Sequence, residues 1–291
     1  MSSVILSAKN LNYLYSKGTS SQIHAIRDIN VNIEKGELVG IIGHTGSGKS
    51  TLIQHFNGLL KGTSGVVELD GEDIWKDKTK IRNVRFRVGI CFQYPEYQLF
   101  EETVYKDIAF GPGNMKLEEA EIDRRVKEAL AFVGLDESYL QKSPFDLSGG
   151  EKRRVAIAGV MAMKPEVLIL DEPCAGLDPK GRETVLKMIM DYRKQTGSTV
   201  LVVSHSMEDI SKISTKVLVM NESELAYYDT VDGVFSHAQQ LKEMGLNIPQ
   251  LTELFLRLKE KGYDVNTDIY TMEKAKEELL KLLKGGVKNA Q

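Results

Sequence analysis

The sequence has few of the features that mark secreted, membrane-spanning or nucleic-acid-binding proteins. Only two of its 291 residues are cysteines, Cys91 and Cys174, and they lack metal-ligand spacing, so we expect two reduced thiols in a cytosolic protein. The longest apolar run, residues 155–163, is about half the length that a membrane-spanning helix needs. The first residues lack the basic and apolar regions of a signal peptide. A formal net charge of -3 gives no reason to expect a nucleic-acid partner.

Glycine is present in quantity, and the most informative glycines lie in one short segment. A short apolar strand, residues 38–42, leads into it, and residues 52–56 continue it as the first turns of a helix. The segment reads Gly43-His44-Thr45-Gly46-Ser47-Gly48-Lys49-Ser50-Thr51. This is the phosphate-binding loop (P-loop) pattern, in which glycines let backbone N–H groups converge on phosphate oxygens. We expect Lys49 to reach the β- and γ-phosphates of a nucleotide and the Ser50 hydroxyl to bind Mg²⁺.

The pattern of apolar residues predicts an α/β fold with a β-rich N-terminal layer at residues 4–35. Residues 29–33 alternate strictly between apolar and polar, as a strand with one solvated face does. Further strands are predicted at residues 65–71, 87–92, 167–170, 200–203 and 217–220. The last three are almost wholly apolar, which is typical of buried parallel strands. Apolar residues at helical spacing between 117 and 134 predict a helical insertion that ends at Gly134.

Two further motifs lie where such folds bind ligands. The apolar run 167–170 ends in Asp171 and Glu172, at the carboxyl end of a predicted strand. Asp171 is suited to hold Mg²⁺, and Glu172 is placed to polarise an attacking water as a general base. The segment Leu147-Ser148-Gly149-Gly150-Glu151 is a second small, flexible loop that opens a helix, and it predicts a second phosphate-facing turn.

With these motifs in this order, residues 4–230 resemble the ATP-binding cassette (ABC) ATPases. The resemblance implies a P-loop NTPase core, with a helical subdomain at about residues 94–165, that binds ATP and Mg²⁺. It implies that Tyr15 stacks on adenine, although Tyr13 is an alternative. The turn of Ser148, Gly149 and Gly150 then binds the γ-phosphate held by an opposite subunit. The resemblance also implies that Gln93 contacts Mg²⁺ and the attacking water. It implies that Asp178 belongs to the family's D-loop motif and that His205 contacts the γ-phosphate.

A narrower resemblance is to the ATPase subunits of energy-coupling factor (ECF) transporters. It rests on residues 93–100 (Gln-Tyr-Pro-Glu-Tyr-Gln-Leu-Phe), 44–45, 57–60 and 110–112, and on the C-terminal extension. Those complexes import vitamins or transition-metal ions into prokaryotic cells. The resemblance implies a peripheral ATPase on the cytoplasmic face of the cell membrane that pairs with a second ATPase subunit, identical or paralogous. It also implies a transmembrane coupling protein and, indirectly, a substrate-binding membrane protein.

Residues 231–291 predict a small C-terminal helical extension. One helix is expected from about Pro249 to Gly262, and a second from the N-cap Thr271 to Gly285. Their apolar stripes are Leu251, Leu254, Phe255 and Leu258 in the first and Met272, Ala275, Leu279 and Leu282 in the second. The stripes either pack on the chain's own body or hold two ATPase subunits together, and the sequence leaves both readings open.

The segment that follows Gln93 mixes large apolar residues with residues that interrupt strand and helix periods. The apolar ones are Tyr94, Tyr97, Leu99 and Phe100, and the interrupting ones are Pro95, Glu96 and Gln98. We expect a loop whose side chains line a groove for a helix of the coupling protein. The alternative is that these aromatic rings are buried between the α/β core and the helical insertion.

Other interpretations explain fewer of the motifs. A soluble ABC ATPase of DNA repair would carry long heptad coiled coils, and one of translation two cassettes in tandem, and the sequence has neither. An ATPase of another ABC transporter is the nearer alternative. A P-loop kinase leaves the signature segment and His205 unexplained. A catalytically inactive subunit would need neither Glu172 nor His205.

Overall fold

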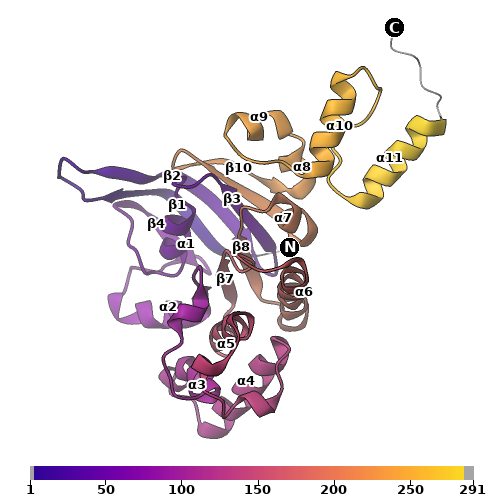
Figure 1. The fold of residues 1–291 in the computed structure, drawn as a ribbon. Coiled ribbons are helices and arrows are strands. Elements are labelled where there is room, and N and C mark those ends of the chain that lie inside the picture. Colours follow the sequence, from indigo (N-terminus) through magenta and orange to yellow (C-terminus); the bar gives the residue numbers. More distant parts are fainter. Residues whose placement is uncertain (1–2, 285–291) are drawn as a thin grey trace.

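Two β-sheets, one antiparallel and one mainly parallel, form the frame of the molecule (Figure 1). The structure is a computed structural model that describes residues 3–284. The antiparallel sheet has the strand order β2-β1-β4-β5. Its strands are β1 (Val4–Tyr15), β2 (Ile23–Glu34), β4 (Ser64–Leu69) and β5 (Glu72–Asp73). This sheet is the predicted N-terminal β layer.

The second sheet has the order β10-β9-β3-β8-β7-β6, and only β10 runs antiparallel to its neighbour. Its strands are β3 (Leu38–Gly43), β6 (Val88–Cys91), β7 (Val167–Asp171), β8 (Thr199–Val203), β9 (Lys216–Asn221) and β10 (Glu224–Thr230). Every residue of β3, β7 and β8 is buried. The apolar runs in the sequence therefore correspond to central parallel strands, and the predicted α/β fold is confirmed.

Alternate residues of the parallel strands pack into two different hydrophobic cores. In β7, Val167 and Ile169 belong to the core that includes the antiparallel sheet and α1 (Lys49–Phe56). Leu168 and Leu170 belong to the core that includes α5 (Gly149–Met161), α6 (Pro179–Thr196) and α7 (Met207–Ile213). Because successive side chains of a strand point to opposite faces, one apolar run serves both cores.

The helices between β6 and β7 confirm the predicted helical insertion. It contains a 3-10 turn (Pro95–Gln98), α3 (Val104–Asn114), α4 (Glu119–Phe132) and α5 (Gly149–Met161). The short α2 (Ile81–Arg87) precedes it. Gly134 adopts a left-handed φ of 69° directly after α4, as the predicted helix stop requires. The sequence did not predict α3, because two glycines and Pro112 in its last turn interrupt the helical pattern.

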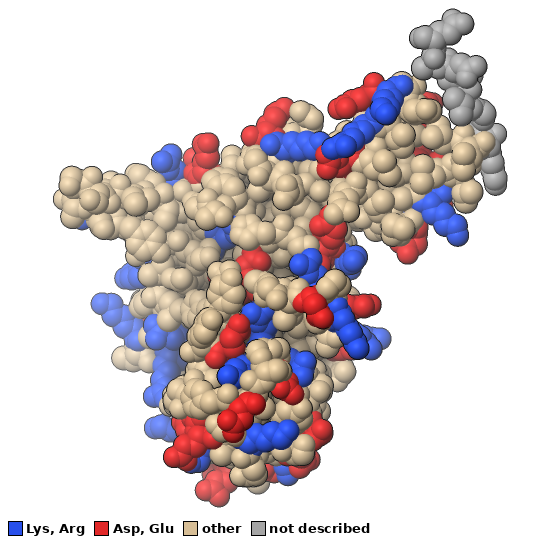
Figure 2. All heavy atoms as spheres, in the orientation of Figure 1, with Lys and Arg blue, Asp and Glu red and all other residues tan. Residues whose placement is uncertain are grey.

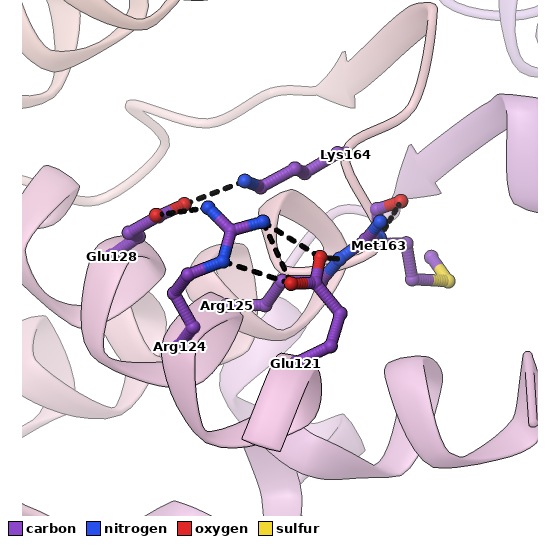
Figure 3. A network of polar contacts seen from close by, with 6 residues as sticks. All are labelled: Glu121, Arg124, Arg125, Glu128, Met163 and Lys164. Carbon is purple, nitrogen blue, oxygen red and sulfur yellow. Dashed lines mark hydrogen bonds and ion pairs between the residues drawn. The ribbon is translucent and has the colours of Figure 1, made fainter. Parts of the chain in front are cut away.

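A network of charged side chains fastens α4 to the turn before β7 (Figure 3). Arg125 donates one hydrogen bond to Glu121 and another, of 3.0 Å, to the Met163 carbonyl. On the same helix, Glu128 pairs with Lys164 at 2.6 Å. Arg124 pairs with both Glu121 and Glu128. Hydrogen bonds from Arg125, and then those from Arg124, lower the pKa of Glu121 to about 2.

Between β10 and residue 284 the chain contains four helices, of which the sequence predicted only the last two. They are α8 (Val231–Phe235), α9 (Ala238–Glu243), α10 (Gln250–Glu260) and α11 (Met272–Lys284). The helix predicted from about Pro249 is confirmed as α10, whereas α8 and α9 were not predicted, because they are too short to show a helical period. Apolar side chains of α8 and α9, with Leu246 and Ile248, join the core of the α/β body. The packing therefore changes near residue 249, whereas the domain boundary at residue 230 remains a prediction from sequence.

Helices α10 and α11 form a small unit with its own core, on the opposite side of the α/β body from α3–α5 (Figure 1). That core contains Phe255, Val265, Ile269 and Ala275. Two members of the predicted stripes are instead exposed, Leu254 by 44% and Met272 by 70%. The Lys274 N–H donates to the Thr271 hydroxyl at 3.3 Å, which supports Thr271 as N-cap, whereas Gly285 lies outside the described residues.

No helix among residues 3–284 is long and apolar enough to cross a bilayer. On the face drawn in Figure 2, basic and acidic side chains lie interspersed over the helical subdomain, whereas the tip of the β1–β2 hairpin carries few charges.

Candidate functional site

The carboxyl ends of three neighbouring strands bring most of the predicted site residues to one edge of the parallel sheet. The P-loop follows β3, Asp171 ends β7, and His205 follows β8. Register places Val203 of β8 opposite both Ile41 of β3 and Asp171 of β7. Parallel strands align their carboxyl ends at one edge, so this sheet edge assembles the candidate site.

The P-loop has a backbone that only glycine permits at two positions. Gly48 adopts a φ of 101° before α1, and a Cβ there would strike the Ala25 carbonyl oxygen. A Cβ on Gly43 would lie 2.5 Å from the Ser47 hydroxyl. That hydroxyl is buried and has no hydrogen-bond partner among the described residues, so it is available to bind a ligand.

The Lys49 side chain is buried inside the loop that carries it. Its Nζ donates to the carbonyl oxygens of Gly43 at 2.7 Å and His44 at 2.9 Å. Burial lowers the pKa of Lys49, and the charges of Glu172 and Asp171 oppose that shift. The ammonium group is thus held without a direct carboxylate partner, which suits a phosphate-binding lysine.

Ser50 and Asp171 meet across the site. The Ser50 hydroxyl donates to Asp171 Oδ2 at 3.3 Å. Burial raises the pKa of Asp171, while the Ser50 hydrogen bond and Lys49 lower it. A hydroxyl and a carboxylate are hard oxygen donors of the kind that Mg²⁺ prefers. No cluster of three or more His, Cys, Asp or Glu residues capable of holding a metal occurs in the described part of the chain, so a cation here would need further oxygens from phosphate and water.

Glu172 occupies an unusual backbone conformation at the end of β7. Its φ of 51° is rare for a side chain of this size, and its N–H donates to the Val203 carbonyl at 3.0 Å. Burial, and then the charge of Asp171, raise the pKa of Glu172 to about 7. Its Oε1 atom is buried and has no hydrogen-bond partner among residues 3–284. A carboxylate held in this way is suited to accept a proton.

His205 faces Glu172 from the neighbouring strand. Its Nε2 atom lies 3.5 Å from Glu172 Oε1, and its side chain is half exposed. Burial and, after it, the charge of Lys49 lower the pKa of His205, which disfavours the charged ring that an ion pair with Glu172 requires. The two side chains are therefore close neighbours rather than an ion pair.

Tyr15 is more accessible than its alternative, Tyr13. Tyr15 is exposed, with its hydroxyl 3.4 Å from Thr51 Oγ1. Tyr13 packs on the hydrophobic core, and its ring stands edge-on to Tyr15 at 4.8 Å and to His55 at 4.7 Å. The arrangement leaves Tyr15 as the ring that a flat ligand can reach from the P-loop side.

The remaining predicted residues stand apart from this cluster. Gln93 lies two residues beyond β6 and is exposed. Ser148 caps α5 in a reciprocal box with Glu151, and Asp178 caps α6 through the Gly181 N–H at 2.7 Å. No hydrogen bond or ion pair among the described residues joins Gln93, the turn Ser148–Gly150 or Asp178 to the P-loop.

Sequence reasoning missed one pair, Arg153 and Glu96. The Arg153 side chain is buried and forms a two-bond ion pair with Glu96, at 2.9 and 3.2 Å. One signal was available: Arg153 shares a helix face with Ile157 and Met161, both buried. A charged residue on an apolar helix face indicates a buried partner.

Comparisons with known proteins agree on the family. The family model described as ABC transporter matches residues 26–175. The "Energy-coupling factor transporter ATP-binding protein EcfA2" of Clostridium tetani is 54% identical over 97% of this chain and 98% of its own length, and that of Clostridium perfringens 53% over 95% and 97%.

Solved structures give the same result. The protein cbiO1 of Clostridium perfringens, described as part of the ABC transporter complex cbiONQ, superposes with a TM-score of 0.74 and 41% identity over 87% of this chain and 98% of that one. The cassette MJ0796, solved with ADP and Pi in a dimeric post-hydrolysis state, gives a TM-score of 0.70 at 28% identity over 78% and 99%. This chain therefore belongs to the ABC transporter ATPases and, among them, to the ATP-binding proteins of energy-coupling factor transporters.

Proposed function

We propose that this chain is the ATP-hydrolysing subunit of an ECF-type importer of vitamins or transition-metal ions, and that it works by closing against a second ATPase subunit. The observation that carries the proposal is the Glu172 carboxylate, whose Oε1 has no hydrogen-bond partner among residues 3–284, at the sheet edge where Ser50 meets Asp171. Membership of the family supplies the transport context. The protein would then act as a peripheral subunit on the cytoplasmic face of the membrane.

Each site residue has a role that its surroundings support. Lys49, the unpaired Ser47 hydroxyl and the loop N–H groups of residues 43–51 would hold the phosphates, with Tyr15 under the adenine. Ser50 and Asp171, with Gln93 from the segment after β6, would hold Mg²⁺, which neutralises phosphate charge when bound. Glu172 would take the proton of the attacking water, and His205 would contact the γ-phosphate.

A second ATPase subunit explains the residues that stand apart. The turn Ser148–Gly150 opens α5 with backbone N–H groups at an accessible helix start, and Asp178 opens α6. In our proposal these residues complete the site of the opposite subunit, so that two ATP molecules lie between two chains. A dimer is the form in which the related cassette MJ0796 was solved.

The membrane partner is proposed to dock in an apolar groove beside the 3-10 turn Pro95–Gln98. A groove of about 470 Å³ is lined by Gln98 of this turn, by Leu99 and Phe100 directly after it, and by residues of α2, α3 and α5, among them Arg82, Phe86, Phe110 and Val160. Tyr97 is 84% exposed and Phe100 58%, so the alternative that these aromatic rings are buried is wrong. Exposed aromatic residues around an apolar groove are typical of a protein-docking site. We infer that a helix of the transmembrane coupling protein occupies it.

The double change Tyr97→Ala with Phe100→Ala tests this docking site. In vesicles that hold the complete transporter, the double variant should bind ATP normally but lose ATP-driven uptake or release the membrane partner. Both side chains are exposed, so the fold should survive. Val4→Ala, which shortens an exposed apolar side chain at the start of β1, is the control. Normal uptake by the double variant would show that the groove is not the docking site of the membrane partner.

A second experiment identifies the partners directly. Purification of the tagged chain from native membranes should bring down a second ATPase subunit and a transmembrane protein. Docking must also differ between nucleotide states, because ATP moves the partner only through a difference in affinity. Recovery of the chain alone under mild detergent, with and without nucleotide, would contradict the transporter assignment.

A further inference from the structure

Arg153 is a buried charged residue to which the candidate catalytic site assigns no role. It lies in the first half of α5, and the residue is only 4% exposed. A guanidinium cannot lose its charge at any physiological pH, so its burial requires several hydrogen-bond partners. The partners that it has come from two loops that are far apart in the sequence.

The first loop is the 3-10 turn that lines the groove. The Nη2 of Arg153 donates to Glu96 Oε1 at 2.9 Å, and its Nε to Glu96 Oε2 at 3.2 Å. Glu96 is itself mostly buried, and the hydrogen bonds from Arg153 hold its pKa below the usual range, against the opposing effect of burial. Glu96 thus faces inward from the turn whose Tyr97 faces outward.

The second loop is the segment that leaves Glu172. The Nη1 of Arg153 donates to the Pro173 carbonyl at 3.4 Å and to the Ala175 carbonyl over a shorter distance. These carbonyls lie between Glu172 and Asp178, so they share the short segment that carries the general base and the cap of α6. One planar side chain therefore holds both loops at once, and its fork of donors allows this geometry.

Stability alone is a weak reason for this arrangement. Burying an ion pair costs desolvation that its attraction often fails to offset, and apolar residues would fill the same space as well. A buried pair that joins two functional loops does set their relative position. If one loop moves, either the hydrogen bonds break or the other loop must move with it.

We infer that Arg153 is a positioning residue that transmits movement of the groove turn, through Glu96, to the Glu172 segment, through the carbonyls of Pro173 and Ala175. The inference rests on the proposed function, since it takes the groove as the docking site. A helix that docks against the turn displaces Glu96, and Arg153 carries the displacement to the position of Glu172. Conversely, when ATP changes the position of the Glu172 segment, Arg153 and Glu96 transmit that movement to the membrane partner.

Arg153→Lys is the first test, made in the complete transporter in vesicles. Lysine keeps the charge but has a single ammonium group, which cannot serve the carboxylate and both carbonyls with the same geometry. We expect kcat for hydrolysis to fall about tenfold, the effect of losing one charge-assisted hydrogen bond, with the KM for ATP unchanged. Arg125→Lys is the matched control, because Arg125 also joins a glutamate to a carbonyl, away from both loops.

The exchange Glu96→Arg with Arg153→Glu separates positioning from simple stability. It can restore the ion pair, but it places a carboxylate opposite the Pro173 and Ala175 carbonyls, which cannot donate to it. We expect the Tm to recover relative to either single change while kcat stays low. Recovery of kcat together with Tm would overturn the inference, as would a kcat loss in Arg153→Lys no larger than in Arg125→Lys. If the exchange variant does not fold, the comparison of those two lysine variants decides.

The same measurements distinguish failure of this inference from failure of the proposed function. If Tyr97→Ala with Phe100→Ala transports normally, the groove is not the docking site, whatever Arg153 does. If that variant is uncoupled but Arg153→Lys keeps normal kcat and normal uptake per ATP, the docking site stands and the transmission through Arg153 is wrong.

Discussion

At the scale of single residues, we propose that hydrolysis depends on Glu172. The fold holds this side chain in a rare backbone conformation, in a buried position and with one oxygen unpaired. Glu172→Gln keeps its shape and removes its basicity. We predict that turnover by the assembled ATPase pair falls by ~10² or more, while ATP binding is retained.

The measurement is steady-state phosphate release, with nucleotide binding followed separately by fluorescence. Glu183→Gln, a change of the same kind at an exposed position on α6, is the control and should be silent. Near-normal turnover by Glu172→Gln would rule out Glu172 as the base.

Tyr15 carries the second prediction at this scale. Stacking of a base on an aromatic ring contributes about 1–3 kcal/mol, so Tyr15→Ala should weaken ATP binding roughly 5- to 150-fold. Tyr15→Phe keeps the ring and loses only the 3.4 Å contact with Thr51, so its affinity should stay close to that of the parent chain. Unchanged affinity of Tyr15→Ala in equilibrium titration would transfer the role to Tyr13 or to neither tyrosine.

The sequence predicted those site residues that short patterns define. The P-loop, Asp171, Glu172 and His205 each follow an apolar strand, and parallel strands bring their ends together by topology. The pair Arg153 and Glu96 escaped prediction because its members lie 57 residues apart and no local pattern links them. Pairing of that kind depends on how α5 packs against the 3-10 turn, which only the folded chain reveals.

At the scale of elements, the attachment of α4 predicts a pH-dependent stability. The pKa of Glu121 falls from its ordinary value of 4.5 to about 2 in the fold, so the ionised carboxylate stabilises the native state. That contribution is complete above about pH 4.5 and disappears as the pH falls toward 2. Glu121→Gln should therefore lower the free energy of unfolding at neutral pH, and its difference from the parent chain should shrink on acidification.

Urea unfolding between pH 3 and 7, at one salt concentration, measures this difference. Because Glu121 lies on the surface, high salt should reduce it as well. A difference that stays constant over the whole pH range would show that Glu121 contributes only through packing.

The C-terminal helices carry a prediction about pairing. A truncation that tests pairing must keep Leu246 and Ile248, because both lie in the core of the α/β body and their loss would damage it. A chain that ends at Pro249 removes only α10 and α11. We predict that this chain binds ATP normally but pairs less tightly with its ATPase partner in the absence of nucleotide, since Leu254 and Met272 leave apolar surface exposed.

Sedimentation with and without nucleotide provides the readout. Equal association of the full and truncated chains would show that the two helices only pack on their own domain. Met272→Ala in the full chain tests the exposed surface without removing any core residue.

Prediction of the elements depended on their length and pattern. The central strands were clear because both of their faces are buried, and α4, α10 and α11 were clear because each has an apolar stripe and a stop or cap residue. Helix α3 was missed where Pro112 and its neighbouring glycines break the period. Helices α8 and α9 were missed because five and six residues are too few to show one.

At the scale of the whole molecule, we propose that one chain holds two incomplete parts of a nucleotide site. The sheet edge supplies the P-loop, Asp171, Glu172 and His205, while Ser148–Gly150 opens a different helix in the helical subdomain. No hydrogen bond among the described residues connects the two parts. In a pair of chains in opposite orientation, the sheet edge of each chain would meet the Ser148–Gly150 turn of the other. This shared site is the central claim of the proposed function.

The dependence of specific ATPase activity on protein concentration tests this claim most directly. We predict that activity per subunit of the ATPase pair falls steeply on dilution through the range in which sedimentation shows dissociation, while each chain still binds ATP. Ser148→Arg should abolish activity at the site whose P-loop belongs to the partner and leave binding at its own P-loop intact. Specific activity that stays constant down to dilutions at which only monomers remain would contradict the shared site.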